Sequence, residues 1–215
     1  MNRRRFSQML VGSAVAAASR PVFAQDRPRV FGHPEFRSSD LSLFPKWQRM
    51  RTRYTTVELP QSERSCLPAP GERCLLQQWR QFLDSISPLD RTSQIREVNQ
   101  RMNLAPYIED INNWGVSDYW ATPGEFFNVS GDCEDYAIAK YKSLRILGFP
   151  NEHLRVVVLR DTNLNLIHAV LVVMSDNEWM VLDNQIQSIM PSTAVYHYYP
   201  YYSINEDYWW LHNQP

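Results

Sequence analysis

Residues 131–141 have the sequence Gly131-Asp132-Cys133-Glu134-Asp135-Tyr136-Ala137-Ile138-Ala139-Lys140-Tyr141, which predicts a tight turn followed by a helix. Counted from Cys133, small or apolar residues recur on one face at positions 137, 141, 144 and 148. Gly148 and Pro150 predict the end of this helix. A cysteine in a first helical turn meets free backbone amides and the positive end of the helix dipole, which favour the thiolate of a nucleophile. The alternative is that Cys133 is a small apolar residue packed at the start of a buried helix.

Three apolar, β-branched runs follow this helix and predict consecutive strands. They span residues 154–160, 166–174 and 178–184. A hairpin turn at Ser175-Asp176 places His168 opposite Asp183, within side-chain reach. An imidazole beside a carboxylate can activate a thiol, so we predict a catalytic triad of Cys133, His168 and Asp183. A shift of one residue in register would separate the pair, and each residue alone has a structural interpretation.

The first 24 residues have the features of an export signal. Arg3-Arg4-Arg5-Phe6 forms a charged start, residues 9–18 form a short apolar run, and Val22-Phe23-Ala24 is an acceptable cleavage site. About ten apolar residues are too few to span a bilayer. The Arg-Arg-x-Phe pattern resembles a twin-arginine signal, but ordinary secretion signals also begin with arginines, so the export route stays open.

Composition favours a single soluble domain over residues 25–215. The mature chain keeps 18 basic and 23 acidic residues, so it lacks the basic excess expected for binding nucleic acid or an anionic membrane. Prolines within residues 25–45 predict an extended or irregular N-terminal arm rather than a core element. Helices are expected over residues 71–85, after an Asp90 cap, and over residues 107–114.

Three cysteines in an exported chain leave one unpaired. Cys66 and Cys74 lie eight positions apart across a proline-containing loop and are the natural disulfide pair. The alternative is that both are buried thiols. Cys133 remains free in either case, and no cysteine pair has the spacing of a zinc site.

Several motifs resemble those of the bacterial transglutaminase-like cysteine peptidases, whose members include periplasmic proteases of the LapG type. They are Asp118-Tyr119-Trp120-Ala121-Thr122-Pro123, the stretch from Gly131 to Lys140, His168-Ala169-Val170-Leu171, Val181-Leu182-Asp183-Asn184 and Tyr202-Ser203-Ile204-Asn205-Glu206-Asp207. The resemblance covers most of the chain after about residue 75. It implies an α+β fold of the papain-like or transglutaminase-like type, with the nucleophile at a helix N-terminus packed on an antiparallel sheet.

The resemblance also implies an activity and its partners. The chain would be a periplasmic, calcium-dependent cysteine endopeptidase that cleaves the N-terminal region of a large cell-surface adhesin, which controls surface attachment and biofilm. An inner-membrane receptor for a cyclic dinucleotide would sequester it. The catalytic residues carried over are Cys133, His168 and Asp183, and the calcium ligands are Asp132 and Glu134.

The acids beside Cys133 pose an electrostatic problem. Asp132, Glu134 and Asp135 should raise the thiol pKa and so oppose the helix dipole. A bound Ca²⁺ would cancel this repulsion, provided that Asp132 lies before the regular helix, which Gly131 permits. The alternative is that these acids only cap the helix.

Other interpretations of the chain remain open. Trp120 is either a substrate-groove residue or a core residue, and the tyrosine-rich tail from Tyr196 to Trp210 predicts closing strands rather than a binding surface. The same triad could transfer an acyl group to an amine, as a transglutaminase does, because both reactions share a thioester intermediate. A third interpretation is a non-catalytic binding module on the same fold.

Overall fold

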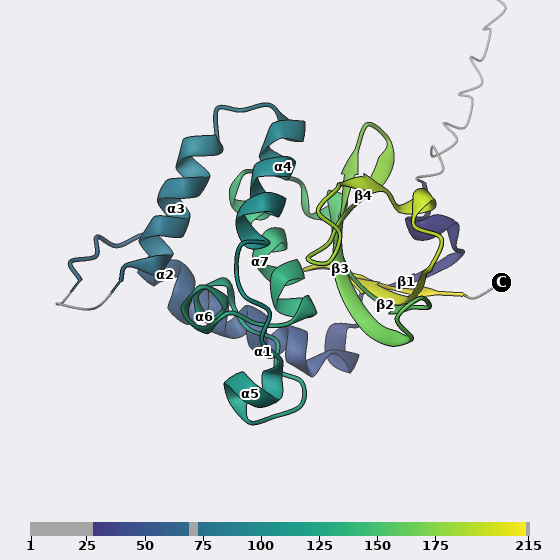
Figure 1. The fold of residues 1–215 in the computed structure, drawn as a ribbon, viewed down its shortest axis with the longest axis horizontal. Coiled ribbons are helices and arrows are strands. Elements are labelled where there is room, and N and C mark those ends of the chain that lie inside the picture. Colours follow the sequence, from purple (N-terminus) through teal and green to yellow (C-terminus); the bar gives the residue numbers. More distant parts are fainter. Residues whose placement is uncertain (1–27, 69–72, 214–215) are drawn as a thin grey trace, which may run out of the picture.

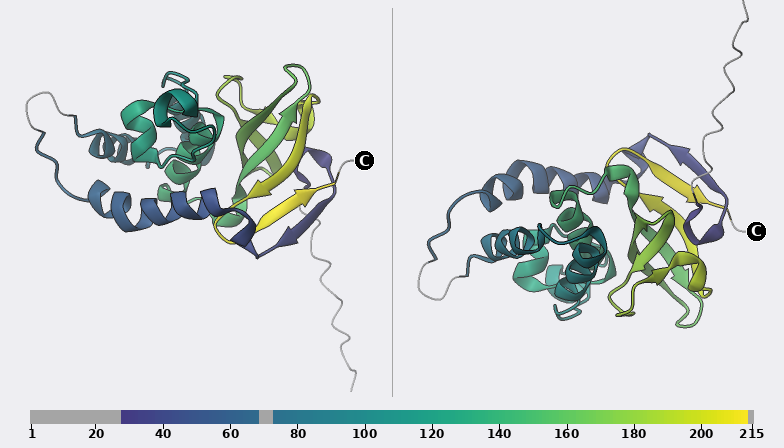
Figure 2. Two further views of the ribbon diagram at one scale, coloured as in Figure 1. Left: turned by 90° about the horizontal axis from the view of Figure 1, so that it is seen from below. Right: turned by 90° about the horizontal axis from the view of Figure 1, so that it is seen from above.

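The computed structural model describes residues 28–68 and 73–213, with helices gathered in one half and strands in the other (Figure 1). The helices are α1 (Pro45–Arg53), α2 (Leu59–Ser62), α3 (Leu75–Ile86), α4 (Arg91–Met102), α5 (Asp110–Trp114), α6 (Pro123–Val129) and α7 (Cys133–Ile146). A π-helical segment, Tyr54–Glu58, joins α1 to α2 in one continuous rod (Figure 2). Short 3₁₀ turns lie at Val30–Gly32, Leu41–Leu43, Asn151–His153 and Ser192–Ala194.

The strands form one curled antiparallel sheet in the order β1-β7-β6-β2-β3-β4-β5 (Figures 1 and 2). They are β1 (Glu35–Ser38), β2 (Leu154–Asp161), β3 (Leu166–Ser175), β4 (Glu178–Leu182), β5 (Met190–Pro191), β6 (Tyr198–Ile204) and β7 (Trp209–His212). The predicted α+β class is confirmed, and the tyrosine-rich tail forms the strands β6 and β7 as expected. No helix among the described residues is long and apolar enough to cross a membrane.

Two apolar cores lie on the two faces of the sheet. The larger core joins the helices to one face through side chains such as Trp47, Trp79 and Leu171. Strand residues alternate between faces, so Val170 and Val172 contribute instead to the second core. Val30 and Phe31, from the N-terminal part of the described chain, also pack in that second core.

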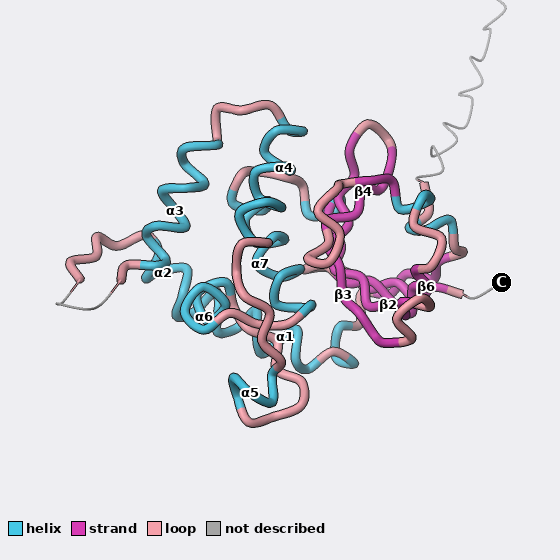
Figure 3. The backbone as a smooth tube through the Cα atoms, viewed as in Figure 1, coloured by secondary structure: helices cyan, strands magenta, loops and turns pink. Residues whose placement is uncertain are grey.

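The central helix α7 lies between the other helices and strand β3 (Figure 3). It is buried on all sides from Asp135 to Leu144. The apolar stripe counted from Cys133 therefore does not identify a single buried face of this helix. Gly148 has a φ of 81°, and the Phe149 amide donates to the Leu144 carbonyl, so the helix ends where predicted.

The β3–β4 hairpin differs in register from the prediction. Ser175 pairs with Glu178, so the turn residues are Asp176 and Asn177 rather than Ser175 and Asp176. Both turn residues have positive φ, as a two-residue hairpin turn of type I′ requires. The pairing is therefore shifted by two residues, which keeps His168 and Asp183 on the same face of the sheet.

The predicted extended or irregular arm over residues 25–45 contains a short strand in its middle part. Glu35–Ser38 forms β1, which pairs with β7 at the edge of the sheet. The prolines on either side of this strand led to the prediction, because proline indicates a loop except at the edge of a sheet. The predicted signal segment, residues 1–24, lies outside the described residues.

The structure confirms the predicted disulfide between Cys66 and Cys74. Helix α3 begins at Leu75, so Cys74 is its N-cap residue rather than an internal residue as predicted. The disulfide therefore ties the start of α3 to the chain that follows α2.

We expect the double substitution Cys66→Ser/Cys74→Ser to lower the free energy of unfolding by about 2.5 kcal/mol, because it removes a covalent constraint on the unfolded chain. Urea unfolding of the mature chain measures this change. Wild-type protein under reducing conditions is the control and should lose the same amount. Finding three free thiols by mass spectrometry of unreduced wild-type protein would contradict the pairing.

Candidate active site

Cys133 is the first residue of α7, and the residues around it fix its position. Asp132 is the N-cap, with an extended backbone that places it before the regular helix. Asp135 is fully buried, and its carboxylate accepts a hydrogen bond from the Ala121 amide at 2.7 Å. A Cβ on Gly131 would lie 2.2 Å from this carboxylate, so only glycine fits there. The first turn of α7 is thus anchored to the segment that precedes α6.

His168 and Asp183 form a buried pair, each 1% exposed. His168 Nε2 lies 2.9 Å from Asp183 Oδ1. Hydrogen bonds from His168, Tyr198 and the Gln185 amide hold the pKa of Asp183 below its usual range, although burial acts in the opposite direction. Asp183 is therefore an acceptor, so Nε2 carries the hydrogen and Nδ1 remains for another partner.

A cavity of about 460 Å³ brings two of the three predicted catalytic residues together. Cys133 and His168 both line it. Trp120 also lines the cavity but is only 7% exposed and packs edge-on against Trp47. It is at once a core residue and part of the cavity wall.

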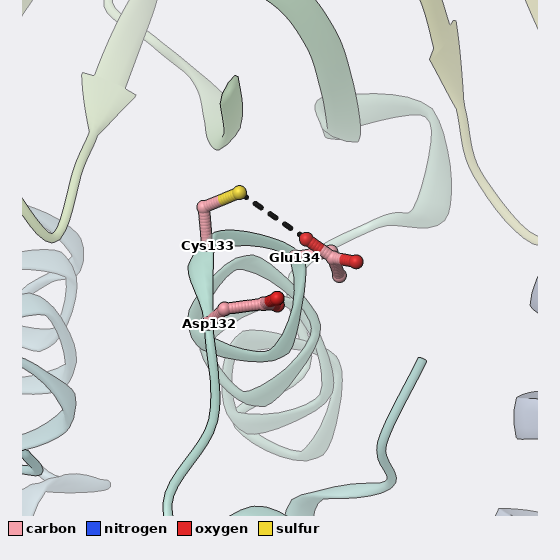
Figure 4. A group of neighbouring side chains, drawn as sticks. All are labelled: Asp132, Cys133 and Glu134. Atoms are coloured by element: carbon pink, nitrogen blue, oxygen red, sulfur yellow. Dashed lines mark hydrogen bonds between the residues drawn. The ribbon is translucent and has the colours of Figure 1, made fainter. Parts of the chain in front are cut away.

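Carboxylates gather beside the thiol at the start of α7. Figure 4 shows Asp132, Cys133 and Glu134 in this turn, with the Cys133 sulfur 3.2 Å from Glu134 Oε2. Asp132 and Glu134 each offer an oxygen within 4.8 Å of that sulfur and of each other. Asp110 from α5 and the exposed Asp118 bring oxygens within the same distance of Glu134. With Asp135, which lies within the same distance of Asp110 and Asp132, five carboxyl groups from three segments of the described chain meet here.

This cluster fits a hard divalent cation. Asp110 Oδ1 and Asp132 Oδ1 are buried and accept no hydrogen bond from the described part of the chain. Burial raises the pKa of Asp110, Asp132 and Glu134, with further contributions from neighbouring carboxylates. Buried carboxylate oxygens without donors are the ligands that Ca²⁺ prefers.

The pKa of the Cys133 thiol does not follow the expectation that a helix start favours the thiolate. Burial raises the pKa of Cys133 well above its ordinary value, and the charges of Glu134 and Asp132 raise it further. The helix start alone therefore does not produce a thiolate here. The opposing effect of the acids was anticipated from the sequence, whereas the larger effect of burial was not.

Sequence reasoning missed Asp110 and Asp118 as members of the cluster. Asp110 is the first residue of the short helix α5, where an acid is expected for capping alone. Its second oxygen accepts a hydrogen bond from the Tyr119 amide, which draws the segment after α5 toward the cavity. Asp118 forms an ion pair with Lys46. No local spacing connects either acid to Glu134.

Comparison with known proteins identifies a similar solved structure and the family of this chain. Legionella pneumophila LapG is 31% identical to this chain, with a TM-score of 0.60, over 72% of this chain and 84% of LapG. Its calcium-bound form matches equally well, and its EGTA-treated form gives a TM-score of 0.61 over 73% and 83% of the two chains at the same identity. Among curated proteins, none matches. The family profile of the bacterial transglutaminase-like cysteine proteinases matches residues 72–214, so the chain belongs to that family.

Proposed function

We propose that this chain is an exported, calcium-dependent cysteine endopeptidase whose catalytic triad is Cys133, His168 and Asp183. The observation that carries the proposal is the shared cavity: Cys133 and His168 both line it, and His168 is hydrogen-bonded to Asp183 from behind. This is the arrangement of nucleophile, base and orienting group.

In the proposed reaction, Cys133 Sγ attacks the peptide carbonyl carbon while His168 Nδ1 takes the thiol proton. His168 then gives this proton to the leaving amine, and water hydrolyses the thioester. Asp183 keeps the other imidazole nitrogen, Nε2, protonated, which leaves Nδ1 as the base. Because the thiol pKa is raised, this proton transfer matters more here than in a site with a resting thiolate.

Part of the oxyanion site is supplied by the start of α7. The backbone amide of Cys133 is among the first helical amides, which have no intrahelical acceptor. An oxyanion formed on the carbonyl attacked by Cys133 lies next to this amide, which can donate to it. The helix dipole stabilises the same negative charge.

We further propose that Asp132 and Glu134 hold Ca²⁺ together with Asp110 and Asp118. Support comes from the clustered oxygens and from the buried acceptors that lack donors. The ion would supply positive charge beside the thiol and fix the turn that carries it. The calcium-bound LapG structure is consistent with this assignment.

The substrate and partners follow from the family resemblance. We propose that the chain acts in the periplasm, after removal of residues 1–24, and cleaves the N-terminal region of a large surface adhesin. An inner-membrane receptor for a cyclic dinucleotide would sequester it and so control attachment and biofilm. Trp120 would form part of the wall along which the substrate lies.

We expect Cys133→Ala to lower cleavage of adhesin N-terminal fragments from the same genome by at least about 1,000-fold, because the nucleophile is lost. Alanine suits a helical first turn, so thermal unfolding should stay close to wild type. Cleavage is followed by gel and by mass spectrometry of the products. Residual cleavage near the wild-type rate would contradict the triad.

A labelled primary amine added to the wild-type reaction separates hydrolysis from acyl transfer. The endopeptidase predicts two unlabelled products with new termini. Label attached to an intact acceptor chain would instead support the transglutaminase alternative, since both reactions pass through the same thioester.

Removing Ca²⁺ with EGTA should abolish cleavage, and Ca²⁺ but not Mg²⁺ should restore it. The half-saturating Ca²⁺ concentration should rise as pH falls, because the carboxyls have raised pKa values and protons compete with the cation. Calcium titrations of activity at several pH values measure this. Full activity in chelator would leave only helix capping as the role of these acids.

Asp110→Asn should raise the half-saturating Ca²⁺ concentration by roughly tenfold or more, because it removes a charged ligand from the cluster. Glu109→Gln is the matched control, since it removes one charge from the same cavity wall but lies outside the cluster. Isothermal titration with Ca²⁺ compares the two variants. Equal effects would show that overall charge, not coordination by Asp110, governs binding.

A further inference from the structure

The Asp183 carboxylate is held by donors from three directions. Asp183 lies just beyond the end of β4, where strand pairing no longer fixes the chain. Its Oδ1 accepts from His168 Nε2 and from the Gln185 amide, both at 2.9 Å. Its Oδ2 accepts from the Tyr198 hydroxyl at 2.5 Å. Tyr198 therefore binds the oxygen that His168 does not use.

We propose that Tyr198 is a positioning residue that acts on His168 through Asp183; the assignment rests on the triad proposed above. Its hydroxyl fixes the rotation of the carboxylate, so that Oδ1 stays directed at His168 Nε2. The imidazole then keeps its Nδ1 available to the Cys133 thiol.

The position of Tyr198 in the sheet supports this role. Tyr198 lies on β6, which is separated from β3 by β2. Its side chain reaches past β2, and its ring packs edge-on against His168 with 5.8 Å between the ring centres. The hydroxyl thus connects the end of β4 to a strand on the far side of β2.

The hydrogen bond from Tyr198 to Asp183 is buried, so its loss would leave the carboxylate oxygen without a donor. Tyr198, His168 and Asp183 are 2%, 1% and 1% exposed, so water has little access to replace a missing donor. The terminal torsion of an aspartate is broad and roughly two-fold, which lets an unrestrained carboxylate exchange its two oxygens. A donor on Oδ2 removes that freedom, and without it a buried oxygen loses its partner.

Three ionisable groups face Asp183 from the elements packed around it. They are His168 on β3, Tyr198 on β6 and the buried Lys140 on α7. The hydrogen bond from Tyr198 is one of the contacts that lower the pKa of the Asp183 carboxyl. Loss of this donor raises that pKa, so Asp183 is protonated at a higher pH as the solution is acidified.

The test is Tyr198→Phe, which removes the hydroxyl and keeps the ring. We expect kcat/KM on the adhesin fragment, measured at saturating Ca²⁺, to fall by about tenfold or more. We also expect the acidic limb of the pH profile to move to higher pH. If Tyr198 had a purely structural role, Tyr198→Phe would lower the melting temperature. The acidic limb of the pH profile of the folded protein would then stay where it is in wild type.

Tyr199→Phe is the matched control. Tyr199 is the next residue in β6, and its side chain lies on the opposite face, with its ring 5.1 Å from that of His33. This variant removes an equal hydroxyl away from Asp183, so both kcat/KM and the acidic limb should match wild type. An equal loss in both variants would overturn the proposal.

A readout independent of cleavage separates this proposal from the proposed function. Nitrogen-15 NMR of histidine-labelled protein reports which His168 nitrogen carries the proton. We expect one tautomer in wild type and a mixture in Tyr198→Phe, even if no adhesin fragment is cleaved. Identical His168 spectra together with an unmoved acidic limb would overturn the role of Tyr198, whereas absent wild-type cleavage alone would overturn the peptidase assignment.

Discussion

The buried carboxyl group of Asp135 determines where Cys133 lies. It accepts the Ala121 amide at 2.7 Å and the Asp132 amide at 3.4 Å, so it connects the start of α7 to the segment that forms one cavity wall. Burial raises the pKa of Asp135 well above its ordinary value, while the hydrogen bonds from the Ala121 and Asp132 amides act in the opposite direction. The absence of a side chain at Gly131 makes the approach possible. Cys133 is thereby placed by a residue two positions further along the same turn.

The same turn creates a conflict between structure and chemistry. Acids stabilise a helix start, yet Asp132 and Glu134 also oppose ionisation of the thiol between them. Asp110, from a separate helix, adds a third negative group to this region. A divalent cation would resolve the conflict because it pairs with the carboxylates and reverses their effect on the thiol. The proposed calcium dependence would then follow from placing a nucleophilic thiol in an acidic turn.

The sequence predicted the elements whose signals are local. The limits of α7 and the three strands after it follow from apolar periodicity and turn residues. The predicted register of the β3–β4 hairpin was wrong by two residues. An even shift keeps side chains on the same face of the sheet, so the predicted contact between His168 and Asp183 is still present. The roles of Asp110 and Tyr198 were not predictable in this way. Each meets its partners through tertiary packing, and Tyr198 reaches Asp183 across 15 positions of the sequence and two strands of the sheet.

The proposed triad draws on helix α7, strand β3 and the segment just after β4. Helix α7 supplies Cys133 at its start and, two turns later, Lys140, which is fully buried near Asp183. Burial lowers the pKa of Lys140 to about 7, while the charge of Asp183 acts in the opposite direction. Helix α7 therefore carries both Cys133 and an amine that feels the charge of Asp183. Lys140 Nζ is buried and has no hydrogen-bond partner among the described residues, so burial opposes its charged form while the charge of Asp183 favours it.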